Sequence, residues 1–155
     1  MKVGIGQDSH KFLSEDVKKT CVIGGVSFND VPGFSADSDG DVVYHAICNA
    51  ISSITHVYIL GDKAIVMCKE GVTDSKYYLI EAKKSLQGQK INHISISIEA
   101  KRPKLQSSIL QMRKNVAEIL NLDLDQVGIT CTSGNNLGDF GRGYGVQALA
   151  IVQAS

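Results

Sequence analysis

Hydrophobic residues recur along the chain at two spacings, and these spacings predict strands and helices. Apolar and polar residues alternate over 91–100, which predicts a strand with one buried face. Over 38–54 the apolar residues recur at helical spacing, and Ser38 or Asp39 is placed to cap the helix. We expect Asp41 and His45, four residues apart, on the polar side of this helix, opposite an apolar side made of Val42, Val43, Ala46, Ile47, Ala50, Ile51 and Ile54.

The remaining segments extend this alternation of strands and helices. A loop is expected over 29–36, and a Gly-rich loop follows residue 132. Strands are predicted at 1–6, 21–28 (interrupted by Gly24 and Gly25), 127–132 and 144–153, and helices at 73–86 and from Ser107 or Ser108 to Leu120. The pattern predicts one domain over 1–155, an α/β (α+β) two-layer sandwich with a ferredoxin-like order of strands and helices.

Composition narrows the classes of function. The 155 residues are 43% hydrophobic and 21% charged, as in ordinary globular proteins, and 16 basic residues balance 16 acidic ones. This balance offers no basic field for nucleic acid, and no apolar run reaches the length of a membrane span. The first twenty residues have no apolar signal-peptide core, so we expect a cytoplasmic protein. None of the four cysteines has CxxC spacing, and we expect reduced thiols.

Asp8, His10 and His45 are the best candidates for metal ligands. Asp8 and His10 are two residues apart in an extended segment, so their side chains point the same way. With His45 they would give two imidazoles and a carboxylate, which leaves a fourth zinc position open, as in catalytic zinc sites. From spacing alone, the alternative is a capped turn and a solvated helix histidine.

Three further polar segments have a functional and a structural interpretation each. Residues 37–41 hold three aspartates and either cap the helix or meet phosphate through a bridging cation at its N-terminus. The basic turn 101–104 is either solvated surface or a phosphate clamp. Residues 132–135, with the glycines of 141–145, form either a hairpin loop or a phosphate-binding loop.

Taken in order, these segments resemble the 2-C-methyl-D-erythritol 2,4-cyclodiphosphate synthase family over nearly the whole chain. The resemblance rests on several motifs together, which is far more specific than any one of them. They are Gly4-Ile5-Gly6-Gln7-Asp8-Ser9-His10, Ile23-Gly24-Gly25-Val26, Ser38-Asp39-Gly40-Asp41-Val42 with His45, Leu60-Gly61-Asp62, Pro103-Lys104 with Gln111-Met112-Arg113, and Leu137-Gly138 with Gly141-Arg142-Gly143.

The resemblance implies a role for each matching residue. Zinc would be held by Asp8, His10 and His45, one ion per chain. The catalytic positions would be Ser133, where the family has a transition-state-stabilising threonine, and Asp37, where the family has a phosphate-holding histidine. Substrate-binding positions would be Asp8, Ser9, His10, Asp37, Ser38, Asp62, Lys63, Ala64, Ala100, Pro103, Lys104, Leu105, Thr132, Ser133, Gly134, Asn135 and Arg142.

The resemblance also implies a reaction and an assembly. The family is a phosphorus–oxygen lyase of the non-mevalonate isoprenoid pathway. It converts 4-diphosphocytidyl-2-C-methyl-D-erythritol 2-phosphate to 2-C-methyl-D-erythritol 2,4-cyclodiphosphate and releases CMP, by intramolecular phosphoryl transfer. A magnesium or manganese ion would bridge the substrate phosphates beside the zinc. The resemblance further implies a homotrimer with active sites between subunits, and a small-molecule cytidine diphosphate substrate.

The sequence departs from the family pattern in ways that keep a second function open. Asp37 replaces a histidine, Asn135 a glutamate associated with the magnesium-type ion, and Leu149 a glutamate of the central cavity. The segment after Asp62 is shorter, and Asp139-Phe140 replaces a Phe-Thr pair. The alternative is therefore a diverged trimeric protein that binds zinc and nucleotide without turnover. A third reading is a zinc-dependent hydrolase of an unrelated substrate, although no separate general base stands out.

Overall fold

The computed structural model describes residues 1–155 and contains one four-stranded sheet and one small hairpin. The order across the sheet is β1 (Lys2–Lys11), β6 (Gly145–Ala154), β4 (Ile91–Glu99) and β5 (Val127–Thr132). Strands β4 and β5 are parallel, and the other two pairs are antiparallel. The hairpin consists of β2 (Cys21–Ile23) and β3 (Val26–Phe28), and it turns at Gly24 and Gly25, both of which have positive φ.

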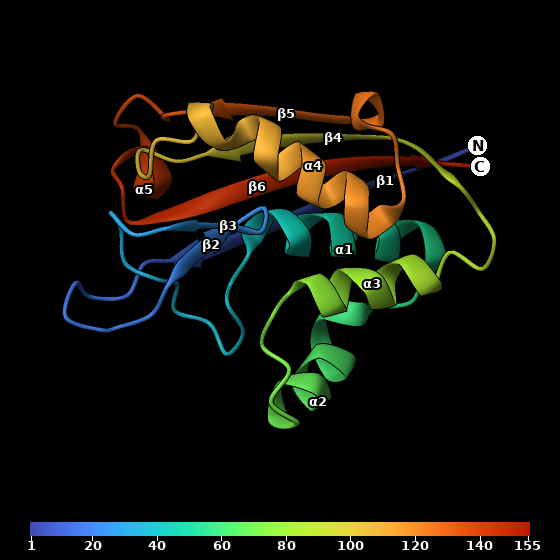
Figure 1. Cartoon of the computed structure of the whole chain (residues 1–155), viewed down its shortest axis with the longest axis horizontal. Helices are drawn as coiled ribbons and strands as arrows, with labels where there is room; N and C mark the ends of the chain where they lie inside the picture. Colours follow the sequence, from blue (N-terminus) through green and yellow to red (C-terminus); the bar gives the residue numbers. More distant parts are fainter.

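The helices form a second layer beside the sheet (Figure 1). Helix α1 packs on β1 and β6, and α4 packs on β5. The helices are α1 (Val42–Thr55), α2 (Ala64–Lys69), α3 (Lys76–Lys84), α4 (Ile109–Leu120) and the single turn α5 (Gly138–Gly141), with three further turns, η1 (Ile59–Lys63), η2 (Gln106–Ser108) and η3 (Leu124–Gln126). The predicted two-layer mixture of helices and strands is confirmed.

The ferredoxin-like order is wrong. That order needs a β-hairpin between its two helices, whereas here β4 crosses through α4 to its parallel neighbour β5. Strand β6 then inserts between β1 and β4. The cause lies in pairing between distant segments, because β6 is the last strand in sequence and satisfies the backbone groups of both the first strand and β4.

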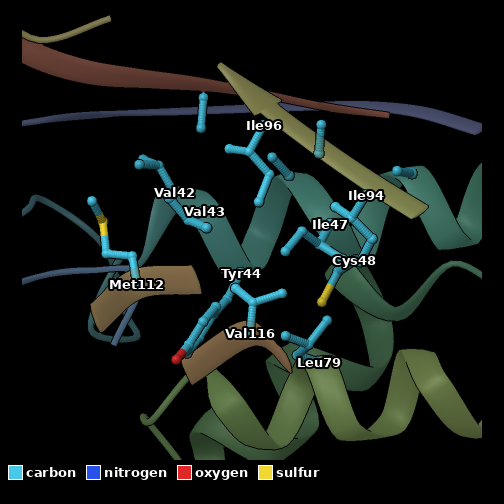
Figure 2. Close-up of a cluster of buried hydrophobic side chains, with 14 of the residues drawn as sticks. Val42, Val43, Tyr44, Ile47, Cys48, Leu79, Ile94, Ile96, Met112 and Val116 are labelled. Carbon is cyan, nitrogen blue, oxygen red and sulfur yellow. The ribbon is translucent and has the colours of Figure 1, made fainter. Parts of the chain in front are cut away.

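One continuous cluster of 37 buried apolar side chains fills the space between the layers. Figure 2 shows its centre, where side chains of α1 such as Val43 and Ile47 meet Ile94 and Ile96 of β4. The alternation predicted for β4 is confirmed: the isoleucines at 94, 96 and 98 are buried, and the serines between them are exposed.

Two glycines let α1 lie directly on β1. A Cβ atom on Gly4 would overlap the carbonyl oxygen of Ala50, and one on Gly6 would overlap the carbonyl oxygen of Ala46. The strand and the helix therefore touch backbone to backbone. Because side chains of a strand alternate, Gly4 and Gly6 lie on the same face as the two residues that come next at this spacing, Asp8 and His10.

Helix α1 begins later and is buried more completely than the sequence predicts. Asp41 is its N-cap, and its carboxylate accepts hydrogen bonds from the N–H groups of Val43 and Tyr44 at 3.1 and 3.2 Å. The predicted caps, Ser38 and Asp39, lie outside the helix. The expected polar side is also wrong, since Asp41 is 0% and His45 7% exposed. The sheet covers one side of α1 and α3 covers another, which leaves little solvent-facing surface.

Several other boundaries differ from the prediction. Strand β1 continues to Lys11, so the first two candidate ligands lie in the strand instead of beyond it. Helix α3 starts at Lys76 because the backbone of Thr73 is already bonded to Asp39, whose N–H donates to the Thr73 carbonyl at 2.9 Å. The helical turns over 59–69 were not predicted.

The four cysteines are free thiols, as expected. No helix is both long and apolar enough to cross a bilayer.

The outer face of the sheet carries no helix. Apolar side chains of β1 and β6 point outward there and stay exposed: Val3 by 65%, Ile5 by 63%, Leu149 by 40% and Ile151 by 46%. The two strands are paired neighbours, so these four residues form one apolar patch, the outer patch. An exposed apolar patch of this kind is typical of an interaction surface.

Candidate metal centre and active site

Three side chains converge where the N-terminal turn of α1 crosses β1. The Nε2 atom of His10 lies 2.9 Å from Oδ2 of Asp8, and the Nδ1 atom of His45 lies 3.1 Å from the same oxygen. The two ring nitrogens are 3.3 Å apart. The glycine contact between β1 and α1 brings His45 to this position, because it fixes the helix against the strand within one turn of the site.

These three atoms fit one zinc ion. Zinc bonds to nitrogen and oxygen are about 2.0–2.2 Å long, so neighbouring ligands at a tetrahedral ion lie about 3.3 Å apart. The observed separations of 2.9, 3.1 and 3.3 Å are close to that edge length. Two imidazoles and a carboxylate suit zinc better than magnesium, which prefers oxygen ligands alone. The three residues predicted from the sequence therefore lie together, with their ligand atoms within 4.8 Å of one another.

The charge of Asp8 is favoured by its neighbours. Burial by itself raises the pKa of the Asp8 carboxyl, but the hydrogen bonds and charges of His10 and His45 lower it by more, so the pKa lies below its ordinary value. Asp8 is thus held as the carboxylate, which is the form that binds a metal.

His45 is held from its other side as well. Its Nε2 atom lies 2.8 Å from the hydroxyl oxygen of Ser75, which is fully buried. The Ser75 hydroxyl donates in turn to Oδ1 of Asp39, and the Ser75 N–H donates to Oδ2 of Asp39 at 3.1 Å. The sequence points to Asp39 only as a helix cap or as part of an acidic segment facing phosphate, and it does not point to Ser75.

The segment that carries Asp37 and Ser38 is anchored by Lys19. The Lys19 ammonium donates to the carbonyl oxygens of Phe34, Ala36 and Ser38 at 2.8, 2.7 and 2.7 Å. Asp37 itself is exposed and makes no ion pair, whereas Ser38 is buried. The sequence gives no sign of this anchor, since Lys19 reads as one of several lysines in an exposed loop.

Asp62, Lys63 and Ala64 lie where η1 passes into α2. Asp62 and Lys63 are exposed, and Ala64 is half-buried. The ammonium of Lys63 is 2.6 Å from a carboxylate oxygen of Glu81, so this ion pair links the turn to α3. The turn is anchored in the core by Ile59, which is buried, and the ion pair adds a contact at the surface.

The predicted cytidine and phosphate residues gather at the carboxyl ends of two parallel strands. Residues 100–105 follow β4 and residues 133–135 follow β5, and the N–H of Ala100 donates to the carbonyl of Thr132 at 2.9 Å. Pro103 and Leu105 are buried, while Lys104, Thr132, Ser133 and Asn135 are exposed and Gly134 is half-buried. Arg142, at the end of α5, is also exposed. The hydroxyls and the Lys104 ammonium therefore face solvent together at one sheet end.

We call Asp8, His10 and His45 the metal group, and we call Lys104, Thr132 and Ser133 the cytidine group after their predicted role. The two groups lie at opposite edges of the sheet. Asp8 is level with Ala148, Ile98 and Cys131 across the four strands. Three strand spacings of about 4.8 Å separate Asp8 from Cys131, which is about 14 Å. Ser9 points away from the metal group because it alternates with Asp8 and His10 along β1, and it is exposed. No hydrogen bond in the chain joins the metal group to Lys104, Thr132 or Ser133.

Comparison with known proteins agrees with the motifs. The family model described as the YgbB family matches residues 1–155. A relative from Chlamydia felis named 2-C-methyl-D-erythritol 2,4-cyclodiphosphate synthase is 54% identical over 153 residues, which covers 97% of this chain and 87% of the relative. A protein of the same name from Chlamydia trachomatis serovar D is 52% identical, with 97% and 86% covered.

Solved structures give the same picture of the fold. The IspF protein of Plasmodium falciparum, in a CDP complex, superposes with a TM-score of 0.83 at 26% identity and covers 99% of this chain and 94% of that chain. A 2C-methyl-D-erythritol-2,4-cyclodiphosphate synthase in a CDP-bound form superposes with a TM-score of 0.79 at 25% identity, covering 99% and 100%. The resemblance seen in the motifs is confirmed, and the chain belongs to the 2-C-methyl-D-erythritol 2,4-cyclodiphosphate synthase family.

Proposed function

We propose that this chain converts 4-diphosphocytidyl-2-C-methyl-D-erythritol 2-phosphate to 2-C-methyl-D-erythritol 2,4-cyclodiphosphate and CMP. The observation that carries the proposal is the Asp8–His10–His45 group, assembled with zinc-like spacing in a chain that is more than half identical to synthases of this name. The reaction is an intramolecular phosphoryl transfer between two anionic groups. Positioning and charge neutralisation then supply most of the rate, and no nucleophilic side chain is needed.

Asp8, His10 and His45 would hold one zinc ion per chain, with the fourth position open to a phosphate oxygen. When bound, zinc supplies a positive charge that polarises and orients a phosphate group. Ser38, with Asp62, Lys63 and Ala64, would border the methylerythritol side of the substrate. A magnesium or manganese ion bridging the phosphates remains part of the proposal, since such ions bind phosphate oxygens readily.

The cytidine group would bind the other end of the substrate. Lys104 offers an exposed ammonium, and Thr132 and Ser133 offer exposed hydroxyls at the same sheet end. Solved relatives whose names state bound CDP support a cytidine diphosphate ligand at this fold. Ser133 would donate a hydrogen bond to the transferring phosphate, and Arg142 would add a positive charge from the closing loop.

We further propose a homotrimer in which each active site is shared by two chains. Two observations support it: the outer patch leaves apolar surface uncovered, and the metal and cytidine groups are separated by the width of the sheet within one chain. In a closed ring of three chains, the metal group of one chain can face the cytidine group of its neighbour. A single domain over 1–155 and a cytoplasmic location complete the proposal.

Asp37 favours a second candidate, a trimeric protein that binds zinc and nucleotide without turnover. Its exposed carboxylate stands where the resemblance implies a phosphate-holding histidine. Asn135 replaces the glutamate associated with the magnesium-type ion, which points in the same direction.

CMP release separates these candidates. We expect the purified protein to contain about one zinc per chain and to release CMP from the diphosphocytidyl substrate when zinc and magnesium are present. His45→Ala should lose both zinc and CMP release, whereas His93→Ala, which changes an exposed histidine of β4, should keep both. Zinc and CDP binding without CMP release would favour the second candidate, and protein that binds no zinc would contradict both.

A further inference from the structure

Behind the metal group, two hydrogen-bond contacts, the first of them buried, join His45 to the carboxylate of Asp39. His45 and Ser75 are 7% and 0% exposed, so this side of the imidazole has no access to bulk water. The contacts run from Nε2 of His45 to the Ser75 hydroxyl at 2.8 Å, and from that hydroxyl to Oδ1 of Asp39. The opposite ring nitrogen, Nδ1, is the one that faces Asp8 and His10.

The direction of these hydrogen bonds follows from the number of protons available. A carboxylate only accepts, and Asp39 already accepts from the N–H of Ser75 and from the N–H of Asp41, both at 3.1 Å. The single hydroxyl proton of Ser75 is therefore donated to Asp39. The hydroxyl oxygen then faces His45 with a lone pair, so the proton in that second contact comes from Nε2 of His45. A neutral imidazole protonated on Nε2 has its lone pair on Nδ1, which is the atom needed by the metal.

The first turn of α3 does not need the Ser75 hydroxyl. Asp74 caps this turn, accepting from the N–H of Lys76 at 3.0 Å. Ser75 already has helical dihedral angles, φ −64° and ψ −15°, and its side chain caps no backbone N–H. Its hydroxyl is therefore available for the contacts with His45 and Asp39.

We propose that Ser75 and Asp39 are positioning residues for the metal centre, and that they hold His45 with Nδ1 directed at zinc. The inference rests on the zinc site of the proposed function and extends it to two residues outside the ligand set. Outer partners of this kind fix the ring orientation of a histidine ligand and typically change metal affinity about 10- to 100-fold when they are removed.

Zinc affinity, measured by competition with a chelator, tests the proposal without relying on turnover. Ser75→Ala and Asp39→Asn should each weaken zinc binding about 10- to 100-fold while the fold is retained. Because both substitutions act through the same chain of hydrogen bonds, the double variant should bind zinc about as weakly as the weaker single variant. Asp74→Asn is the control, since it removes a nearby exposed carboxylate that makes no hydrogen bond to Ser75, and it should stay within about threefold of the unmodified protein.

A spectroscopic measurement accompanies the affinities. In the zinc-loaded protein the Nε2–H of His45 should give a slowly exchanging imidazole proton signal, which Ser75→Ala should turn into rapid exchange with water. Single variants that bind zinc normally, losses that multiply in the double variant, or a loss in Asp74→Asn equal to that in Asp39→Asn would each overturn the proposal. Failure of the unmodified protein to bind zinc would instead refute the metal site of the proposed function, so the two failures are distinguishable.

Discussion

Asp37 tests whether charge at a single position limits activity. Its carboxylate is exposed and unpaired on the segment proposed to border the substrate phosphates. Two charges about 4 Å apart in water interact by about 1 kcal/mol, which is about fivefold in binding. We therefore expect Asp37→Asn to lower KM for the diphosphocytidyl substrate about fivefold, and Asp37→His to lower it at least as much.

Steady-state assays at fixed zinc and magnesium concentration measure this change. Asp125→Asn, which removes an exposed charge from η3 just before the start of β5, is the matched control. A higher KM in Asp37→Asn would mean that the carboxylate assists binding, for instance by holding a bridging cation.

The sequence predicts the ligands of the metal centre but not the residues behind them. Asp8 and His10 are recognisable because the two-residue period of a strand brings neighbouring side chains to one face. The sequence correctly predicts His45 as the third residue of the group, but it wrongly places the side chain on a polar side of the helix, whereas the side chain is buried. Asp39 and Ser75 are 36 residues apart in sequence. A hydrogen bond between such distant segments leaves no local pattern, so the sequence does not reveal this contact.

The contact between β1 and α1 should tolerate no side chain. Gly6→Ala would place a Cβ against the carbonyl of Ala46, and the helix would have to move away from the strand. We expect a loss of about 3 kcal/mol in the free energy of unfolding, together with weaker zinc binding, because His45 moves with the helix. Denaturant unfolding and chelator competition on the same sample measure both effects.

Gly128→Ala provides the comparison within the same sheet. The nearest atom to a Cβ at that position is 3.8 Å away, and the backbone of β5 is ordinary there. Its free energy of unfolding should therefore change by less than about 1 kcal/mol. Equal losses in the two variants would show that the close approach of β1 and α1 is not what fixes the site.

The sequence predicts which segments form strands or helices more accurately than it predicts where each element begins and ends. The core strand β4 and helix α4 follow directly from their apolar periods. The start of α1 was misplaced because several capping residues stand in a row at 37–41, and only tertiary contacts decide that Asp39 turns to Ser75 while Asp41 caps the helix. The order of strands could not be read from the sequence, since β6 pairs with strands far from it in the chain.

A shared active site can be tested by mixing two inactive chains. His45→Ala damages the metal group, and Lys104→Ala damages the cytidine group, so each variant alone should be nearly inactive. If the two groups of a site come from neighbouring chains, random one-to-one trimers should recover about a quarter of the unmodified activity, since each half of a site is intact in half of the cases.

Native mass spectrometry confirms that the trimers are mixed, and CMP release reports the activity. Two portions of the same variant, mixed and refolded identically, are the control. Mixed trimers that are no more active than either parent would mean that each site is built within one chain.

The outer patch also has a consequence for how the protein responds to dilution. Four large apolar side chains of β1 and β6 are 40–65% exposed in a single chain, and burial of such surface favours association. Any species that binds only the folded chain raises its apparent stability by mass action. In the proposed homotrimer, the two other chains are the species that binds the folded chain. The melting temperature should therefore fall as the protein is diluted. The abundance of the chain in a cell would then help to set how much of it stays folded.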